Sequence, residues 1–296
     1  MRLALVVMLF GTCVSPVLAK SVTVEQLQQS LSTMHDLPDA QVAQKLSVLE
    51  LTERLSDRSH AHLEGRLPGT ASRQALALLS DKSAFLDLPE SELVARTVPD
   101  HAAQVALLGR TRDYVVKTIA KLPDFIATRE TTKFVSSSIN AHVNSLKGVI
   151  FGPFRHIDSS KVVVVYRNGH ELLDNAKRLS GSPKELKTEG EFGPVLITVF
   201  NDLAKGTVFW GHWEQSATGV LALFRYSVPQ RASHYLVSFS SLTEKTRHYP
   251  AYHGEIALDP VTGSIMRISA IAELDPNDAV SSASLSVEYG PTEIAR

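Results

Sequence analysis

The chain has 296 residues, of which 44% are hydrophobic and 21% are charged, an ordinary globular composition for one large domain or two small ones. Its 30 basic residues nearly balance its 31 acidic ones. No broad basic surface for nucleic acid or for anionic lipid headgroups is therefore expected. The only cysteine is Cys13, which excludes a disulfide framework within the chain.

Residues 1–19, MRLALVVMLFGTCVSPVLA, have the pattern of a signal peptide, with Arg2 before an apolar run and small residues before a cleavage point after Ala19. The run is shorter than the roughly 20 apolar residues of a spanning helix, so we predict no stable membrane span. A lipid anchor at Cys13 is not expected, because the apolar run continues beyond it. The mature chain would begin at Lys20 without cysteine.

From residue 22 to residue 122, apolar residues recur every three or four positions, which predicts amphipathic helices. The repeat ends at Pro38, at the Leu-Pro-Gly run 67–69 and at Pro123. We predict Ser72 as the N-cap of one helix. The expected helices cover residues 23–34, 39–65, 72–88 and 101–122.

After Pro123 the apolar period becomes two, which predicts strands. Hairpins are expected at Asn168-Gly169, a pair typical of two-residue turns, and around the run 259–263, DPVTG. In the second hairpin we predict Glu255 opposite Arg267. Further strands are expected at 125–135, 207–215, 220–228, 234–240 and 284–289.

The predicted fold class is α+β. A helical region at 20–122 is followed by a curved antiparallel β-sheet at 123–296, with the signal peptide at 1–19.

The run WGHWEQ, residues 210–215, contains both tryptophans of the chain. A four-residue loop after it places Trp213 opposite Ala222 and Trp210 opposite Arg225. The two tryptophans then point to opposite faces unless Gly211 forms a bulge. We predict a buried Trp213 and a partly accessible Trp210. One interpretation is ordinary strand packing, with Trp210 over Arg225. The other is a ligand groove lined by Trp210, His212, Leu223 and Arg225.

Other polar groupings have plain explanations. His60 and Glu64 share a helix face, but His62 lies elsewhere, so a solvated surface is expected rather than a metal site. Asp259 lacks the spaced carboxylates of a calcium loop. The chain has no nucleophile elbow, dinucleotide-binding loop or phosphate-binding loop. We predict no catalytic residue, metal or cofactor.

Several segments resemble a family of exported, acidobacterial-type proteins of unassigned function. They include LTERLSDR, YVVKTIAKLPDFIATRETTKF, EFGPVLITVFNDL, HWEQSATGVLALFRYSVP and AYHGEIALDPVTGSIMRI, with the most specific similarity at 191–267. This resemblance implies no catalytic residues. Relatives continue beyond VEYGPTEIAR, so this chain is expected to end early.

The hairpin GEIALDPVTGSIMRI is similar to the LolA/LolB lipoprotein carriers. That likeness implies an incomplete antiparallel barrel closed by helices, with an apolar cavity for acyl chains. The sequence therefore favours a non-enzymatic module exported to the periplasm or beyond, which binds a lipid, another apolar ligand or an envelope protein. Alternatives are a hydrolase using His212 or His253 with nearby carboxylates, and a purely structural envelope protein.

Overall fold

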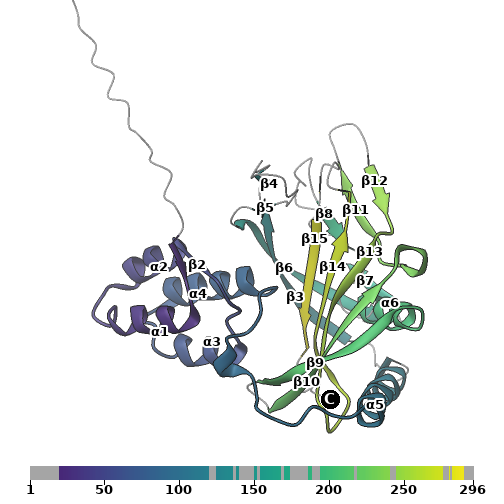
Figure 1. Ribbon diagram of the computed structural model, residues 1–296. Coiled ribbons are helices and arrows are strands. Elements are labelled where there is room, and N and C mark those ends of the chain that lie inside the picture. Colours follow the sequence, from purple (N-terminus) through teal and green to yellow (C-terminus); the bar gives the residue numbers. More distant parts are fainter. Residues whose placement is uncertain are drawn as a thin grey trace, which may run out of the picture.

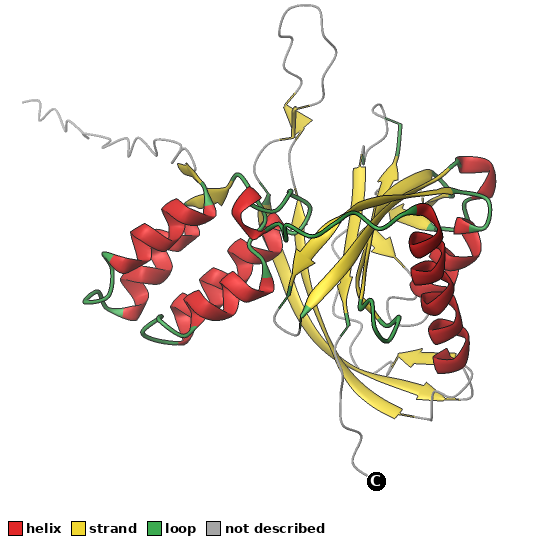
Figure 2. Ribbon diagram, turned by 60° about the horizontal axis from the view of Figure 1, so that its bottom comes forward, coloured by secondary structure: helices red, strands yellow, loops and turns green. Residues whose placement is uncertain are grey.

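The computed structural model confirms an α+β protein (Figure 1). The antiparallel strands lie between the N-terminal helices on one side and two further helices on the other (Figure 2). Within the described residues, none of the helices is both long enough and apolar enough to cross a bilayer. The structure describes residues 20–119, 125–135, 138–139, 150–151, 154–167, 170–173, 186–188, 194–216, 219–240, 245–275, 280 and 282–289.

Residues 20–88 form what we call the helical unit, which has an apolar core of its own. Leucines and valines at helical spacing turn inward and fill this core. The unit consists of β1 (Lys20–Val22), α1 (Val24–Ser32), α2 (Asp39–Ser47), β2 (Leu49–Leu51), α3 (Asp57–Glu64) and α4 (Thr70–Ser83).

The single helix predicted at 39–65 is wrong, because the chain leaves the helix after residue 47. Residues 49–51 form β2, which pairs in parallel with β1 and places Lys20 opposite Leu49. A new helix then starts, with the Ser56 hydroxyl accepting a hydrogen bond from the amide of Ser59. Leu49 and Leu55 are buried in the unit's core on either side of this break, so burial is maintained while the helical period is lost.

Ser72 is not the N-cap that the sequence predicts. The N-cap of α4 is Gly69, which has no side chain to accept a hydrogen bond. The carboxylate of Asp39, from α2, accepts hydrogen bonds from the amides of Ala71 and Ser72 at 2.9 Å each. A residue distant in sequence therefore supplies the cap.

The main sheet has five antiparallel strands in the order β15-β14-β13-β10-β9. Its strands are β9 (Thr207–Gln215), β10 (Val220–Val228), β13 (Ala251–Leu258), β14 (Ile265–Glu273) and β15 (Ser282–Glu288). Smaller sheets contain β3 (Phe125–Val135), β6 (Arg155–Arg167) and β7 (His170–Leu173); β8 (Leu186–Thr188), β11 (Val237–Ser240) and β12 (Lys245–His248); and β4 (Ser138–Ile139) with β5 (Ile150–Phe151).

The two faces of the main sheet have different neighbours. One face carries a large apolar core and packs against α5 (His101–Ile119) and α6 (Pro194–Leu203). We call it the core face. Helix α5 falls in the predicted helical region, yet it packs on the sheet, and the sequence did not predict α6. The other face meets the helical unit, and we call it the docking face (Figure 1). The core face carries Ala222, Phe224, Tyr226, Tyr252, Ile256, Ile268, Ala270 and Ala272.

The predicted hairpins both form, but one register differs from the prediction. Strands β6 and β7 pair with Arg167 opposite His170, as a two-residue turn requires, although the turn itself lies outside the described residues. In the β13–β14 hairpin, Arg267 lies opposite Ala257, so the prediction of Glu255 opposite Arg267 is wrong. Leu258 pairs with Ile265, and a register shift between Ala257 and Leu258 then places Ile256 opposite Ile268. The longer loop and this shift each move the pairing by one residue.

Candidate functional site

The hairpin of β9 and β10 contains a β-bulge at Gly211. Trp213 lies opposite Ala222 as predicted, but Trp210 lies opposite Phe224 rather than Arg225. An added Cβ at Gly211 would stand 2.7 Å from a methyl of Leu223, so the two strands approach closely only because residue 211 has no side chain. The bulge turns both tryptophans to the core face.

The two tryptophans and Phe224 form one aromatic cluster on this face. The Trp210 ring meets Trp213 edge-on at a centroid distance of 4.8 Å and Phe224 at 5.3 Å, within the range favoured by aromatic pairs. Trp213 is 7% exposed, whereas Trp210 is only half-buried. These exposures confirm a buried Trp213 and a partly accessible Trp210. The two rings share one face because the bulge at Gly211, the stated exception to opposite faces, is present.

Residues 89–100, which we call the strap, run from the helical unit to α5 along β9. The Trp213 carbonyl accepts a hydrogen bond from the amide of Val94 at 3.2 Å. The indole Nε1–H of Trp213 donates to the Thr97 carbonyl at 2.9 Å, and the Arg96 guanidinium lies 4.5 Å above its ring. The backbone of Leu93 also forms an isolated antiparallel β-bridge with that of Glu214. Trp213 therefore packs in the core and also binds the strap.

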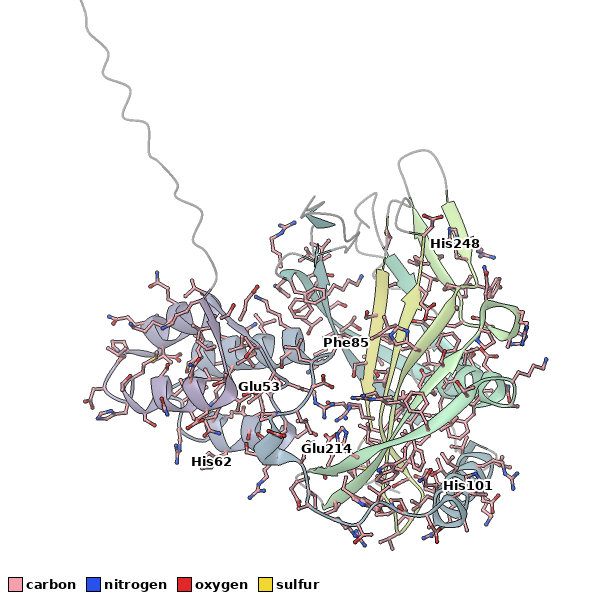
Figure 3. The ribbon with its side chains drawn as sticks, viewed as in Figure 1. Glu53, His62, Phe85, His101, Glu214 and His248 are labelled. Atoms are coloured by element: carbon pink, nitrogen blue, oxygen red, sulfur yellow. The ribbon has the colours of Figure 1, made fainter. Side chains whose placement is uncertain are left out.

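On the docking face, Glu214 lies between the helical unit and the sheet (Figure 3). It binds two arginines from different parts of the chain. Its carboxylate accepts two hydrogen bonds from Arg267, at 2.9 and 2.8 Å, and its Oε2 lies 2.7 Å from Nη2 of Arg54. The side chains of Glu214 and Arg54 are only 4% and 8% exposed. Burial disfavours the charged carboxylate, but the hydrogen bonds and charge of Arg267, and then of Arg54, lower the pKa of Glu214 to about 2.

The four residues of the predicted groove do not come together. Trp210 is on the core face, whereas His212 and Arg225 lie on the docking face, and Leu223 is fully buried there beside Leu221. Arg225 forms ion pairs with carboxylates on both sides of the boundary. A groove lined by all four side chains is therefore not what this arrangement supports.

The two histidines of the hydrolase alternative have different surroundings. Nε2 of His212 is 4.0 Å from Glu214, but that carboxylate is already bound by two guanidinium groups. Burial lowers the pKa of His212, although the charge of Glu214 opposes the shift. His253 forms an exposed pair with Glu273 at 3.0 Å. In the described part of the chain, neither histidine hydrogen-bonds to a hydroxyl that could serve as a nucleophile.

Sequence reasoning missed a third histidine, His234, whose Nδ1 lies 2.5 Å from the buried carboxylate of Asp202. Asp202 also accepts hydrogen bonds from the His234 amide and the Tyr252 hydroxyl. Burial and the bond to Asp202 raise the pKa of Tyr252. The carboxylate thus joins α6, the loop before β11 and β13. No motif marks these residues, because they come from distant segments.

Arg54 and the partnership of Glu214 with Arg267 were missed for the same reason, since an ion pair between distant segments has no local pattern. No protein-family model, curated protein or solved structure matches this chain. The geometry of the site is therefore the basis for a functional proposal.

Proposed function

We propose that this protein is an exported, non-enzymatic module that binds an apolar ligand at the aromatic cluster. The observation that carries the proposal is Trp210, which lies on the core face and yet is only half-buried. Its strand β9 is the edge of the five-stranded sheet, so the aromatic wall continues to the rim of the core. Apolar pockets with aromatic walls are the usual form of small-molecule sites.

The sheet with its covering helices also supports the proposal of a carrier related to the LolA/LolB type. In such a protein, a curved antiparallel sheet holds acyl chains between its inner face and helices. Here α5 and α6 cover the core face of the main sheet. Helix α5 buries a stripe that includes Leu107, Thr111 and Val115. An acyl chain that inserts beside this stripe would displace water from Trp210 and extend the existing core.

Ligand binding is tested by titrating the protein with a fatty acid that carries a dansyl group. We expect saturable binding that Trp210→Ala weakens about tenfold, a loss of about 1.4 kcal/mol, because the ring supplies apolar area and an edge for stacking. Phe209→Ala is the matched control, since Phe209 is the neighbouring aromatic on β9, is 51% exposed and lies opposite Arg225. It should leave affinity within about twofold. Equal losses in both variants, or no saturable binding by the unaltered protein, would contradict the proposal.

Export is tested by sequencing the N-terminus of protein taken from the cell envelope. We expect the mature chain to start at Lys20, the first residue of β1, whose backbone nitrogen donates to the Val48 carbonyl at 3.0 Å. Ala19 lies outside the described residues, and Ala19→Tyr is the control that should block cleavage, because the position before the cut requires a small residue. An intact Met1 on the unaltered protein in a membrane pellet would refute this prediction.

A further inference from the structure

The boundary between the helical unit and the sheet is crossed by charged contacts. Each part has its own apolar core. Arg54 reaches across to Glu214 at 2.7 Å, and Asp87 reaches Arg225 at 3.1 Å. Leu55, the residue after Arg54, is buried in the core of the helical unit. The buried Arg54–Glu214 pair is thus anchored in both parts, and Glu214 lies where they meet (Figure 3).

Three polar side-chain atoms near this boundary are buried and have no protein hydrogen-bond partner among the described residues. They are Nε of Arg54, Oε2 of Glu92 and Nε2 of His212. Buried polar groups are normally paired, and an unpaired one costs stability. Separation of the two parts would return each of these atoms to water. Their hydration on separation would offset part of the loss of the ion pair.

The same end of β9 holds both the helical unit and the strap. Glu214 binds Arg54 through its carboxylate, and the preceding residue, Trp213, binds the Thr97 carbonyl of the strap. The strap then leads directly into α5, where the Asp100 carboxylate accepts a hydrogen bond from an amide of the first turn at 2.8 Å. Two consecutive residues therefore connect the docked unit with the helix on the other face of the sheet.

We propose that Trp213 and Glu214 form a latch that couples docking of the helical unit to the position of α5. When Arg54 leaves Glu214, the strap loses its alignment on β9, Thr97 releases Trp213, and α5 loosens on the core face. Because such a coupling is a free energy between two sites, it is reciprocal, and loosening the strap must also favour undocking. That the latch controls entry of an apolar ligand rests on the proposed function, whereas the coupling itself does not.

The forward direction is tested by hydrogen exchange of backbone amides in the variant Arg54→Met. This change leaves Glu214 paired with Arg267, so no charge is stranded in the sheet. We expect about tenfold faster exchange in residues 93–110, within the ordinary range of coupling between sites, with exchange in β13 and β14 unchanged. The control Arg225→Gln removes the exposed pair with Asp87 at the same boundary and should leave the strap protected.

The reverse direction is tested with Trp213→Phe, which keeps an aromatic ring in the core and removes the donor to Thr97. The chain from residue 20 onward has no cysteine, so spin labels at His62→Cys and Tyr249→Cys report the distance between the two parts. Both positions are exposed. We expect a longer-distance population in Trp213→Phe.

Unchanged exchange in the strap and α5 of Arg54→Met would overturn the latch, and so would an unchanged distance distribution in Trp213→Phe. No ligand is present in either measurement. Failure of the latch and failure of ligand binding are therefore separate results.

Discussion

Glu214→Gln is expected to destabilise the protein by about 3–5 kcal/mol, the usual cost of removing one partner from a buried ion pair. The substitution keeps the shape of the side chain and removes the carboxylate charge that binds the guanidinium groups of both Arg54 and Arg267. Both arginines are nearly inaccessible, at 7% and 8% exposure. Urea unfolding at pH 7, followed by tryptophan fluorescence and circular dichroism, measures the loss.

The effect of Glu214→Gln should depend on pH in a defined direction. The neighbouring arginines lower the pKa of Glu214 from 4.5 to about 2 in the folded protein. A carboxyl group whose pKa is lowered by folding contributes stability to the folded state. This contribution is fully present above the pKa of the unfolded state and is lost as pH falls toward the pKa of the folded state. The difference in free energy of unfolding between the unaltered protein and Glu214→Gln should therefore narrow as pH is lowered from about 4.5 toward about 2.

Glu255→Gln is the matched control for Glu214. Glu255 pairs with Arg225 at 3.1 Å on the same face of the sheet, but both side chains are partly exposed. Solvent-exposed ion pairs contribute little to stability, so Glu255→Gln should lower the free energy of unfolding by no more than about 1 kcal/mol. Equal losses in Glu214→Gln and Glu255→Gln would mean that burial of the Glu214 cluster does not decide its contribution.

Trp213→Ala is expected to cost about 3–5 kcal/mol, as for other buried large aromatics that are truncated to alanine. The change removes the hydrogen bond to Thr97, the contact with Arg96 and the edge-on contact with the Trp210 ring. Such a loss is a large part of the stability of an ordinary domain. Thermal and urea unfolding of the purified variant measure it.

Trp210→Ala is the control for Trp213, because it truncates the same residue type on the same strand at a half-buried position. Its cost should be clearly smaller, because less apolar area is removed from the core. Acrylamide quenching of the single-tryptophan variants gives an independent check. The variant that keeps Trp210 should be quenched more strongly than the one that keeps Trp213. Equal unfolding costs, with equal protection from quenching, would contradict the difference in burial between the two rings.

Local periodicity determined much of the fold. A period of three to four residues before Pro123 and a period of two after it correctly predicted α+β. The four-residue loop after β9 correctly placed Trp213 opposite Ala222, and alternation from that pair predicted its burial. These features depend on which side of a helix or strand each side chain lies. The periodicity of neighbouring residues in the sequence determines that side.

Contacts between distant segments were decided only by the tertiary structure. Gly211 allowed the bulge that moved Trp210 to the core face, since Leu223 packs where a Cβ would lie. The longer loop after Leu258, together with a register shift between Ala257 and Leu258, displaced Arg267 from Glu255. Docking of the helical unit then placed Arg54 beside Glu214. Periodicity specifies a face, but it does not count the residues in a bulge or loop, nor does it choose which distant charge will neutralise a buried one. The bulge, the loop length and the partners of the buried charges follow from close packing in the folded protein and from the need to pair buried charges.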